Sequence, residues 1–148
     1  MRTIWQDDTR RALQDRLAKL TPDRRAAWGK MSAPEMVCHL SESLKMTMGD
    51  LPCAMKDSPL RHAPLKQIVI FFAPWPKGVP TAPELLARVP ASWSNDLREL
   101  NALVDRVAAR RSDASSWPEH PAFGKLTPRA WGRLVYRHID HHLRQFGA

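Results

Sequence analysis

The spacing of hydrophobic residues predicts a first helix from about residue 7 to residue 20. Leucines recur there at steps of four and three residues, at Leu13, Leu17 and Leu20, which places them on one face of an α-helix. Asp7 and Asp8 stand at its start, where the helix dipole favours negative charge, and Thr21-Pro22 ends the pattern.

A second helix is predicted from Ser32 to about Gly49. Ser32 and Glu35 have the spacing of a capping box, and Pro34 is tolerated in the first turn of a helix. The apolar face that follows is made by Met36, Leu40 and Leu44 together with Thr47.

The middle of the chain is rich in proline. Its apolar piece at residues 60–73 contains Ile68-Val69-Ile70-Phe71-Phe72, which has the composition of a strand. No partner strand is recognisable elsewhere, so we expect a short helix there. Residues 74–90 hold five prolines, and any helix in this crossing loop must be short.

Two further amphipathic helices are predicted in the second half. The first carries an apolar stripe at Trp93, Leu97, Leu100, Val104 and Val107, and the second is capped by Thr127-Pro128 and runs to about Gln145. Each stripe has to be buried against another. The sequence therefore predicts an all-α fold, a single bundle domain over residues 1–148 with four substantial helices and one shorter one.

The composition is that of an ordinary soluble protein, with 43% hydrophobic and 26% charged residues among 148. Cys38 and Cys53 cannot build a disulfide framework, and neither belongs to a C-x-x-C pair. The first ten residues lack the apolar segment of a signal peptide, and the longest apolar run, residues 68–73, is far too short to span a bilayer. We therefore expect a cytoplasmic protein with no membrane association.

The net charge of +8 is shared equally between residues 1–74 and 75–148. A nucleic-acid-binding arm would concentrate its basic residues, whereas the arginine doublets here are isolated and have acidic neighbours. A solvated surface that attracts anionic ligands is favoured over a nucleic-acid partner.

Two histidines of the last helix lie in the middle of its apolar face. On a wheel at about 100° per residue from Trp131, His138 falls at about 340° and His142 at about 20°, with His141 at the border. Imidazoles at i and i+4 present ring nitrogens to a common point, which is the geometry of a zinc-binding pair. The pair lacks the Glu of the H-E-x-x-H motif, which excludes a zinc protease, and hydrogen-bonded core histidines remain the alternative to a metal site.

A third ligand has to come from another helix. His39 lies on the shoulder of the second helix's apolar face and is compatible with that role, whereas His62 and His120 lie in or beside proline-bounded loops. Gln145 faces inward and is a candidate to hold a ligand's second nitrogen; Glu42 is a candidate to do so for His39. Their ordinary interpretations are a helix-end amide and a solvated acid.

His39 followed by H-x-x-H-H-x-x-Q on the last helix resembles the DinB-like superfamily of YfiT-type metalloenzymes. Four further stretches resemble a branch of it known mainly as a domain of unknown function. They are Trp28-Gly29-Lys30-Met31-Ser32, Pro74-Trp75-Pro76-Lys77-Gly78, His120-Pro121-Ala122-Phe123-Gly124 and His142-Leu143-Arg144-Gln145-Phe146-Gly147.

This resemblance implies a four-helix bundle of up-down-down-up topology, with the extra short helix in the crossover. It also implies a divalent metal, zinc or nickel, held by His39, His138 and His142. In such relatives the metal activates a low-molecular-weight thiol or a water for thiol transfer, isomerisation or hydrolysis of a small molecule. Many relatives are homodimers, and the family name implies no contact with nucleic acid.

Three functions remain open from the sequence. The leading one is a metal-dependent thiol transferase or hydrolase-like enzyme. The others are a metal- or small-ligand-binding protein without turnover and a basic nucleic-acid-binding domain. Lys77 is a candidate to close over the site or meet an anionic substrate, and Cys38 is a weak candidate nucleophile; a solvated loop lysine and a small core residue are their ordinary interpretations. Metal affinity is expected to fall below roughly pH 6, because only neutral imidazole coordinates.

Overall fold

Four long helices carry the amphipathic stripes expected from the sequence. They are α1 (Asp7–Ala18), α2 (Ala33–Met48), α4 (Trp93–Ala109) and α5 (Pro128–Gln145). The structure, a computed structural model, describes residues 1–78 and 80–148, and within these ranges it contains helices and turns but no β-strand. The prediction of an all-helical fold is confirmed.

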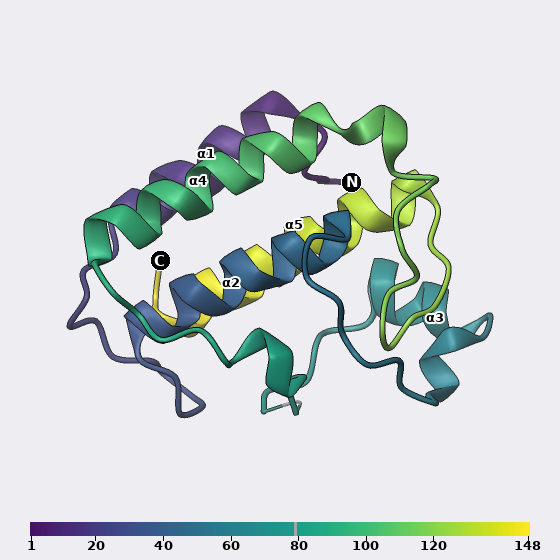
Figure 1. The fold of residues 1–148 in the computed structure, drawn as a ribbon, viewed down its shortest axis with the longest axis horizontal. Coiled ribbons are helices and arrows are strands. Elements are labelled where there is room, and N and C mark those ends of the chain that lie inside the picture. Colours follow the sequence, from purple (N-terminus) through teal and green to yellow (C-terminus); the bar gives the residue numbers. More distant parts are fainter. Residues whose placement is uncertain (79) are drawn as a thin grey trace.

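The long helices pack in contact with one another. Figure 1 shows α1 beside α4 along one edge of the molecule and α2 in front of α5 along the other, and α2 also contacts α4 as α1 contacts α5. The apolar stripes meet between them. The largest fully buried side chains include Leu13, Leu17, Met36, Leu40, Leu100, Trp131, Ile139 and Leu143. Burial of these stripes, rather than helix propensity, supplies most of the stability of such helices.

The predicted capping residues define the starts of α2 and α5. Ser32 Oγ accepts a hydrogen bond from the backbone N of Glu35 over 3.3 Å, and Glu35 Oε2 accepts one from the backbone N of Ser32 over 2.7 Å. Thr127 Oγ1 likewise accepts from the backbone N of Ala130 over 3.2 Å. Each cap satisfies backbone donors that have no partner within the helix.

The segment between α2 and α4 forms only short helical turns. They are η1 (Pro59–Arg61), α3 (Leu65–Gln67), η2 (Ile68–Phe72) and η3 (Pro83–Leu85), and η4 (Arg111–Asp113) follows α4. The short helix expected at residues 60–73 is therefore present in an irregular form, one α-helical turn that continues into a π-helical segment. Among the described residues, no helix combines the length and apolar character needed to cross a membrane.

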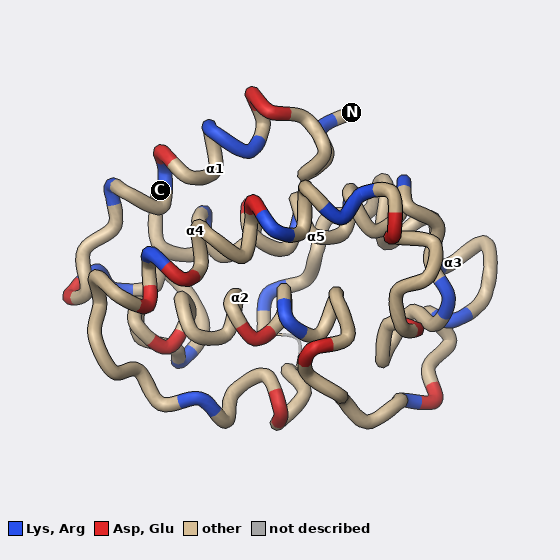
Figure 2. Tube along the Cα trace, turned by 45° about the horizontal axis from the view of Figure 1, so that its top comes forward, with Lys and Arg blue, Asp and Glu red and all other residues tan. Residues whose placement is uncertain are grey.

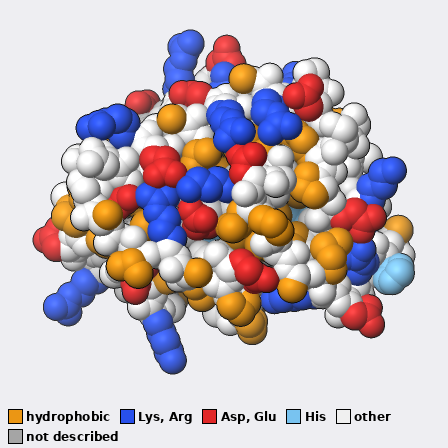
Figure 3. Space-filling view, in the orientation of Figure 1, with side chains coloured by type: hydrophobic (Ala, Val, Ile, Leu, Met, Phe, Trp, Pro, Cys, Tyr) orange, Lys and Arg blue, Asp and Glu red, His pale blue; other side chains and the backbone are white. Residues whose placement is uncertain are grey.

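Basic and acidic residues lie near one another over much of the molecule. Figure 2 marks both kinds along α1, α2 and α4, and Figure 3 shows both on one face. Several arginines form ion pairs, such as Arg16 with Asp140 at 2.7 Å and Arg106 with Asp50 at 2.6 Å. The helix α5 differs from the other long helices, because its arginines outnumber its one acidic residue, Asp140.

Candidate metal centre

Three histidines from two helices meet between α2 and α5. His39 comes from α2, and His138 and His142 come from successive turns of α5. The Nε2 atom of His138 lies 3.0 Å from Nε2 of His39 and 3.2 Å from Nε2 of His142. One ring nitrogen from each residue lies within 4.8 Å of the other two. The structure therefore brings together all three residues that the sequence selected as candidate ligands.

These separations fit a single metal ion. Two imidazole nitrogens bound at 2.0–2.1 Å to a tetrahedral zinc ion are about 3.3 Å apart. The measured separations of 3.0 Å and 3.2 Å are close to this value, so the rings need little movement to share one ion. Imidazole nitrogens suit zinc, nickel, copper and iron alike.

The protein determines which nitrogen of His39 and of His142 carries the hydrogen. Nδ1 of His39 lies 3.3 Å from the carbonyl oxygen of Leu85, and Nδ1 of His142 lies 2.7 Å from Oε1 of Gln145. Gln145 Nε2 donates to the carbonyl oxygen of Trp28 over 2.7 Å, which turns its Oε1 toward His142. Both partners of the histidines are acceptors, so each Nδ1 is the donor and each Nε2 keeps a lone pair.

Both of these lone pairs are directed at Nε2 of His138. A neutral His138 has at most one hydrogen there, so it can donate to His39 or to His142 but not to both. Protonating the cluster does not resolve the conflict. Burial lowers the pKa of His39 to about 4 and that of His142 to about 3, and burial beside the other histidines holds the pKa of His138 well below its usual range. A bound cation satisfies all three nitrogens at once, so the donor set fits a divalent metal.

Gly29 makes room for the amide that orients His142. Its backbone is left-handed, with a φ of 82°, and a Cβ atom added there would lie 2.7 Å from Nε2 of Gln145. This conformation and this close approach both favour glycine. The Trp28-Gly29 turn therefore packs directly on the side chain that holds His142.

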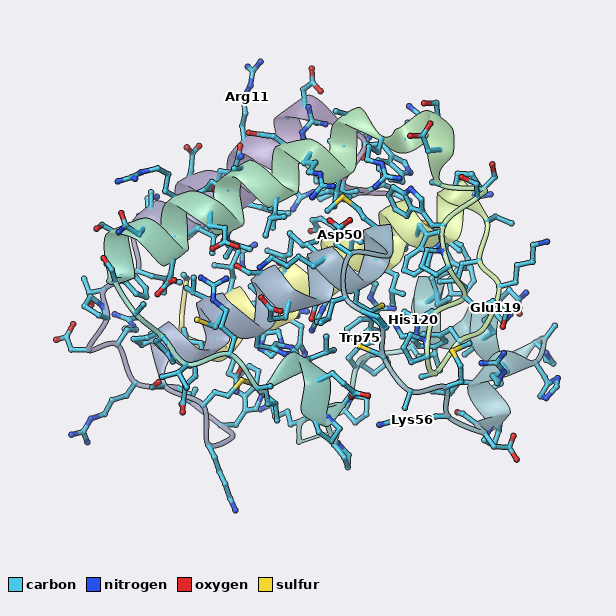
Figure 4. All side chains as sticks on the ribbon, in the orientation of Figure 1. Arg11, Asp50, Lys56, Trp75, Glu119 and His120 are labelled. Carbon is cyan, nitrogen blue, oxygen red and sulfur yellow. The ribbon has the colours of Figure 1, made fainter. Side chains whose placement is uncertain are left out.

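Two tryptophans lie beside the histidines of α5. The ring centroid of Trp75 lies 6.0 Å from those of both His138 and His141, and that of Trp28 lies 5.8 Å from His141. In Figure 4, Trp75 and His120 lie within the body of the molecule, whereas Arg11 projects from α1 into solvent. Sequence reasoning gave neither tryptophan a role, although the prolines on both sides of Trp75 indicated a constrained position.

Trp75 is held in place by Arg137. The guanidinium of Arg137 donates to the carbonyl oxygens of Val69 (2.7 Å), Ile70 (3.1 Å) and Ala73, which the π-helical turn leaves available. Trp75 Nε1 donates to the carbonyl oxygen of Val69 over 3.1 Å, and the Arg137 guanidinium lies 5.2 Å from the Trp75 ring. Arg137, which directly precedes His138 on α5, therefore orders the segment that carries Trp75.

The other candidate residues lie in their ordinary environments or in ion pairs. Glu42 does not contact His39: its Oε1 lies 2.9 Å from Lys45 Nζ and 3.5 Å from Arg88, and the Leu85 carbonyl takes the place expected for it. Cys38 is buried, and burial raises the pKa of its thiol, which makes it a poor nucleophile. Lys77 is exposed, with its Nζ 4.4 Å above the ring of Trp28.

The fold and the cluster define an all-helical protein with a buried three-histidine group able to hold a metal ion. A family model described as "Protein of unknown function (DUF1569)" matches residues 6–148, and the chain belongs to this family. No curated protein and no solved structure matches the chain.

Proposed function

We propose that the protein is a metal-dependent enzyme of the DinB/YfiT type, with a divalent metal, zinc or nickel, on His39, His138 and His142. The observation that carries the proposal is the convergence of three Nε2 atoms, two of which are fixed as lone-pair donors by the Leu85 carbonyl and by Gln145. Such fixed tautomers are typical of metal-binding histidines.

A divalent ion on three neutral imidazoles retains its full charge and an open coordination position, and so lowers the pKa of a water or a thiol bound there. The chain's own residues would supply the surroundings. The Leu85 carbonyl and Gln145 would keep two ligand rings oriented, and Trp75, whose ring centroid lies 6.0 Å from that of His138, would limit the approach of water. Lys77, whose Nζ lies 4.4 Å from the centroid of the Trp28 ring, is the residue we propose to meet an anionic substrate.

We assign the chain, as one domain, to the DinB-like superfamily with an up-down-down-up bundle. Two observations support this assignment. In Figure 1, α1 and α5 run from right to left, whereas α2 and α4 run from left to right. One hydrophobic core also includes residues from Ile4 to Phe146.

The reaction we propose is transfer or hydrolysis on a small-molecule electrophile, with a low-molecular-weight thiol or water as nucleophile. A homodimer in the cytoplasm is the proposed state of the protein. Nucleic acid is not the proposed partner, since arginines such as Arg16, Arg106 and Arg137 are bonded to acidic side chains or to backbone carbonyls within the protein.

The test combines metal analysis with an activity panel. Purified protein is analysed for bound metal and then assayed with small thiols against alkyl halide, epoxide and ester electrophiles. Turnover that requires zinc or nickel and disappears in His138→Ala supports the enzyme. Tight metal binding without turnover makes the protein a metal-binding protein instead. Salt-sensitive DNA binding that persists in His138→Ala would favour the nucleic-acid alternative.

A further inference from the structure

A small cavity lies between α2 and α5 beside His138. Its volume is about 20 Å³, enough for one water molecule. Six apolar side chains line it together with four polar ones, which are Ser43, Thr47, His120 and His138. Its walls come from α2, α5 and His120, so these four groups are the ones available to bond a polar ligand there.

Two of the four polar groups have a hydrogen to donate. Nε2 of His138 is directed at His39 and His142, so as a metal ligand His138 carries its hydrogen on Nδ1. His39 and His142 donate their Nδ1 hydrogens to protein oxygens, whereas His138 Nδ1 has no hydrogen-bond partner among the described residues. In His120, Nδ1 accepts from the backbone N of Ala122 (3.1 Å) and of Phe123 (3.2 Å), so the hydrogen is on Nε2.

The other two polar groups have lone pairs to accept. Ser43 Oγ donates its hydrogen to the carbonyl oxygen of His39 over 2.8 Å, and Thr47 Oγ1 donates to the carbonyl oxygen of Ser43 over 3.0 Å. Each hydroxyl oxygen then keeps two lone pairs. The cavity therefore combines two N–H donors with two hydroxyl acceptors.

We propose that this cavity is a binding site for one structural water, which links His120 to His138. The water accepts hydrogen bonds from His138 Nδ1 and His120 Nε2 and donates to Ser43 Oγ and Thr47 Oγ1. His120 is then a positioning residue: it acts on the metal through the water and through the orientation of the His138 ring. The inference rests on the proposed function in so far as it takes His138 to be a metal ligand.

The site accounts for the one ligand that lacks a protein partner. A metal-bound histidine donates its second ring hydrogen to a carboxylate, a carbonyl or a water. The carbonyl of Leu85 and the amide of Gln145 serve His39 and His142. The cavity water would serve His138 in the same way. The two donors and two acceptors that line the cavity match the up to four hydrogen bonds that a buried water makes.

The proposed water bridge between His120 and His138 is tested by measuring zinc affinity through competition with a chromogenic chelator. Ser43→Ala, Thr47→Val and His120→Asn each remove one partner of the water, and Asn retains an acceptor for the backbone of residues 122 and 123. We expect each to weaken zinc binding about tenfold. Ser41→Ala is the matched control, since Ser41 makes the same bond to the carbonyl four residues before it, on the same helix, outside the cavity. Wild-type affinity in all three cavity variants would overturn the inference.

A crystal structure observes the water directly. We expect a fully occupied water within hydrogen-bond distance of His138 Nδ1 and His120 Nε2, and its loss in Thr47→Val, whose folding is checked by thermal unfolding. An empty cavity in the wild type would overturn the inference. If the wild type takes up no zinc, the proposed function fails, and the metal-free crystal structure decides the water site alone.

Discussion

Nδ1 of His142 lies 2.7 Å from Oε1 of Gln145, one helical turn further along α5. Gln145 is itself fixed by its bond to the Trp28 carbonyl. A side chain that could rotate freely would not choose between the two tautomers of His142, whereas this doubly bonded amide selects the one whose Nε2 lone pair points into the cluster.

Replacing this amide should weaken metal binding without unfolding the protein. Gln145→Leu has a similar volume but accepts no hydrogen bond, so we expect zinc affinity to fall about 10- to 100-fold. Chelator competition measures the change. Gln14→Leu, on the exposed part of α1, serves as control and should bind zinc like the wild type. Equal zinc affinity in Gln145→Leu and Gln14→Leu would show that Gln145 does not contribute to metal binding.

Gly29 should be needed for the site and not only for the fold. Gly29→Ala and Gly78→Ala both place an alanine at positive φ, which costs about 1–2 kcal/mol of stability in each case. Only at Gly29 does the new Cβ meet Gln145, whereas nothing lies within 4 Å of it at Gly78. Denaturant unfolding should therefore show a loss in both variants, larger in Gly29→Ala, and zinc affinity should fall only in Gly29→Ala. A parallel loss of affinity in both variants would contradict this account.

Arg137 should control access to the cluster through Trp75. Arg137→Met leaves the carbonyl oxygens of Ile70 and Ala73 without their donor, and we expect a loss of about 3 kcal/mol in the free energy of unfolding. Trp75 should then cover His138 less well, and bound zinc should transfer to a chelator faster. Trp75→Ala should accelerate this transfer too. Arg133→Met, one turn earlier on α5, is the control, and a transfer rate that is the same in all these proteins would show that Trp75 is no barrier.

Zinc affinity should begin to fall at a lower pH than the value of roughly 6 expected from the sequence. Free imidazole has a pKa of about 6.5, but burial lowers the pKa of His39 to about 4 and that of His142 to about 3. Protons therefore compete with the metal only at low pH, and zinc affinity should stay nearly constant down to about pH 5 and fall below about pH 4. Isothermal titration across this range checks it, and a fall that begins near pH 6 would show that the ligands are exposed.

The same shifts determine the pH dependence of the metal-free protein's stability. On acidification the unfolded chain takes up protons first, near pH 6.5, because the folded imidazoles bind them only near pH 4 and below. The stability contributed by the neutral, buried histidines is thus complete above about pH 6.5. It is lost as the pH falls toward 3, and saturating zinc should delay this loss to lower pH.

The long helices and the inward-facing pair His138 and His142 were accessible from the sequence because they depend on local patterns, whereas the choice of His39 rested on the family resemblance. The capping box at Ser32 and the Thr127-Pro128 start gave the first residues of α2 and α5. Helical periodicity then separated His138 and His142 from the border residue His141. These are properties of a single helix, so they need no knowledge of what packs against it.

What the sequence could not supply depends on contacts between distant segments. The partner of His39 is a backbone carbonyl, that of Leu85, and every residue has one, so no side-chain pattern identifies it. The ion pair of Glu42 with Arg88, which comes from the proline-rich crossing, also depends on how that crossing packs against α2. The π-helical turn at residues 68–72 likewise depends on bonds from Arg137, far away on α5.

The most direct test of the central claim is elemental analysis of the protein as purified and after reloading with zinc or nickel. Wild type and His62→Ala, which removes an exposed histidine, should each hold close to one divalent ion per chain. His39→Ala, His138→Ala and His142→Ala should each lose nearly all of it while keeping the helical circular dichroism spectrum. Equal metal content in the wild type and these three variants, or none in any of them, would contradict the account.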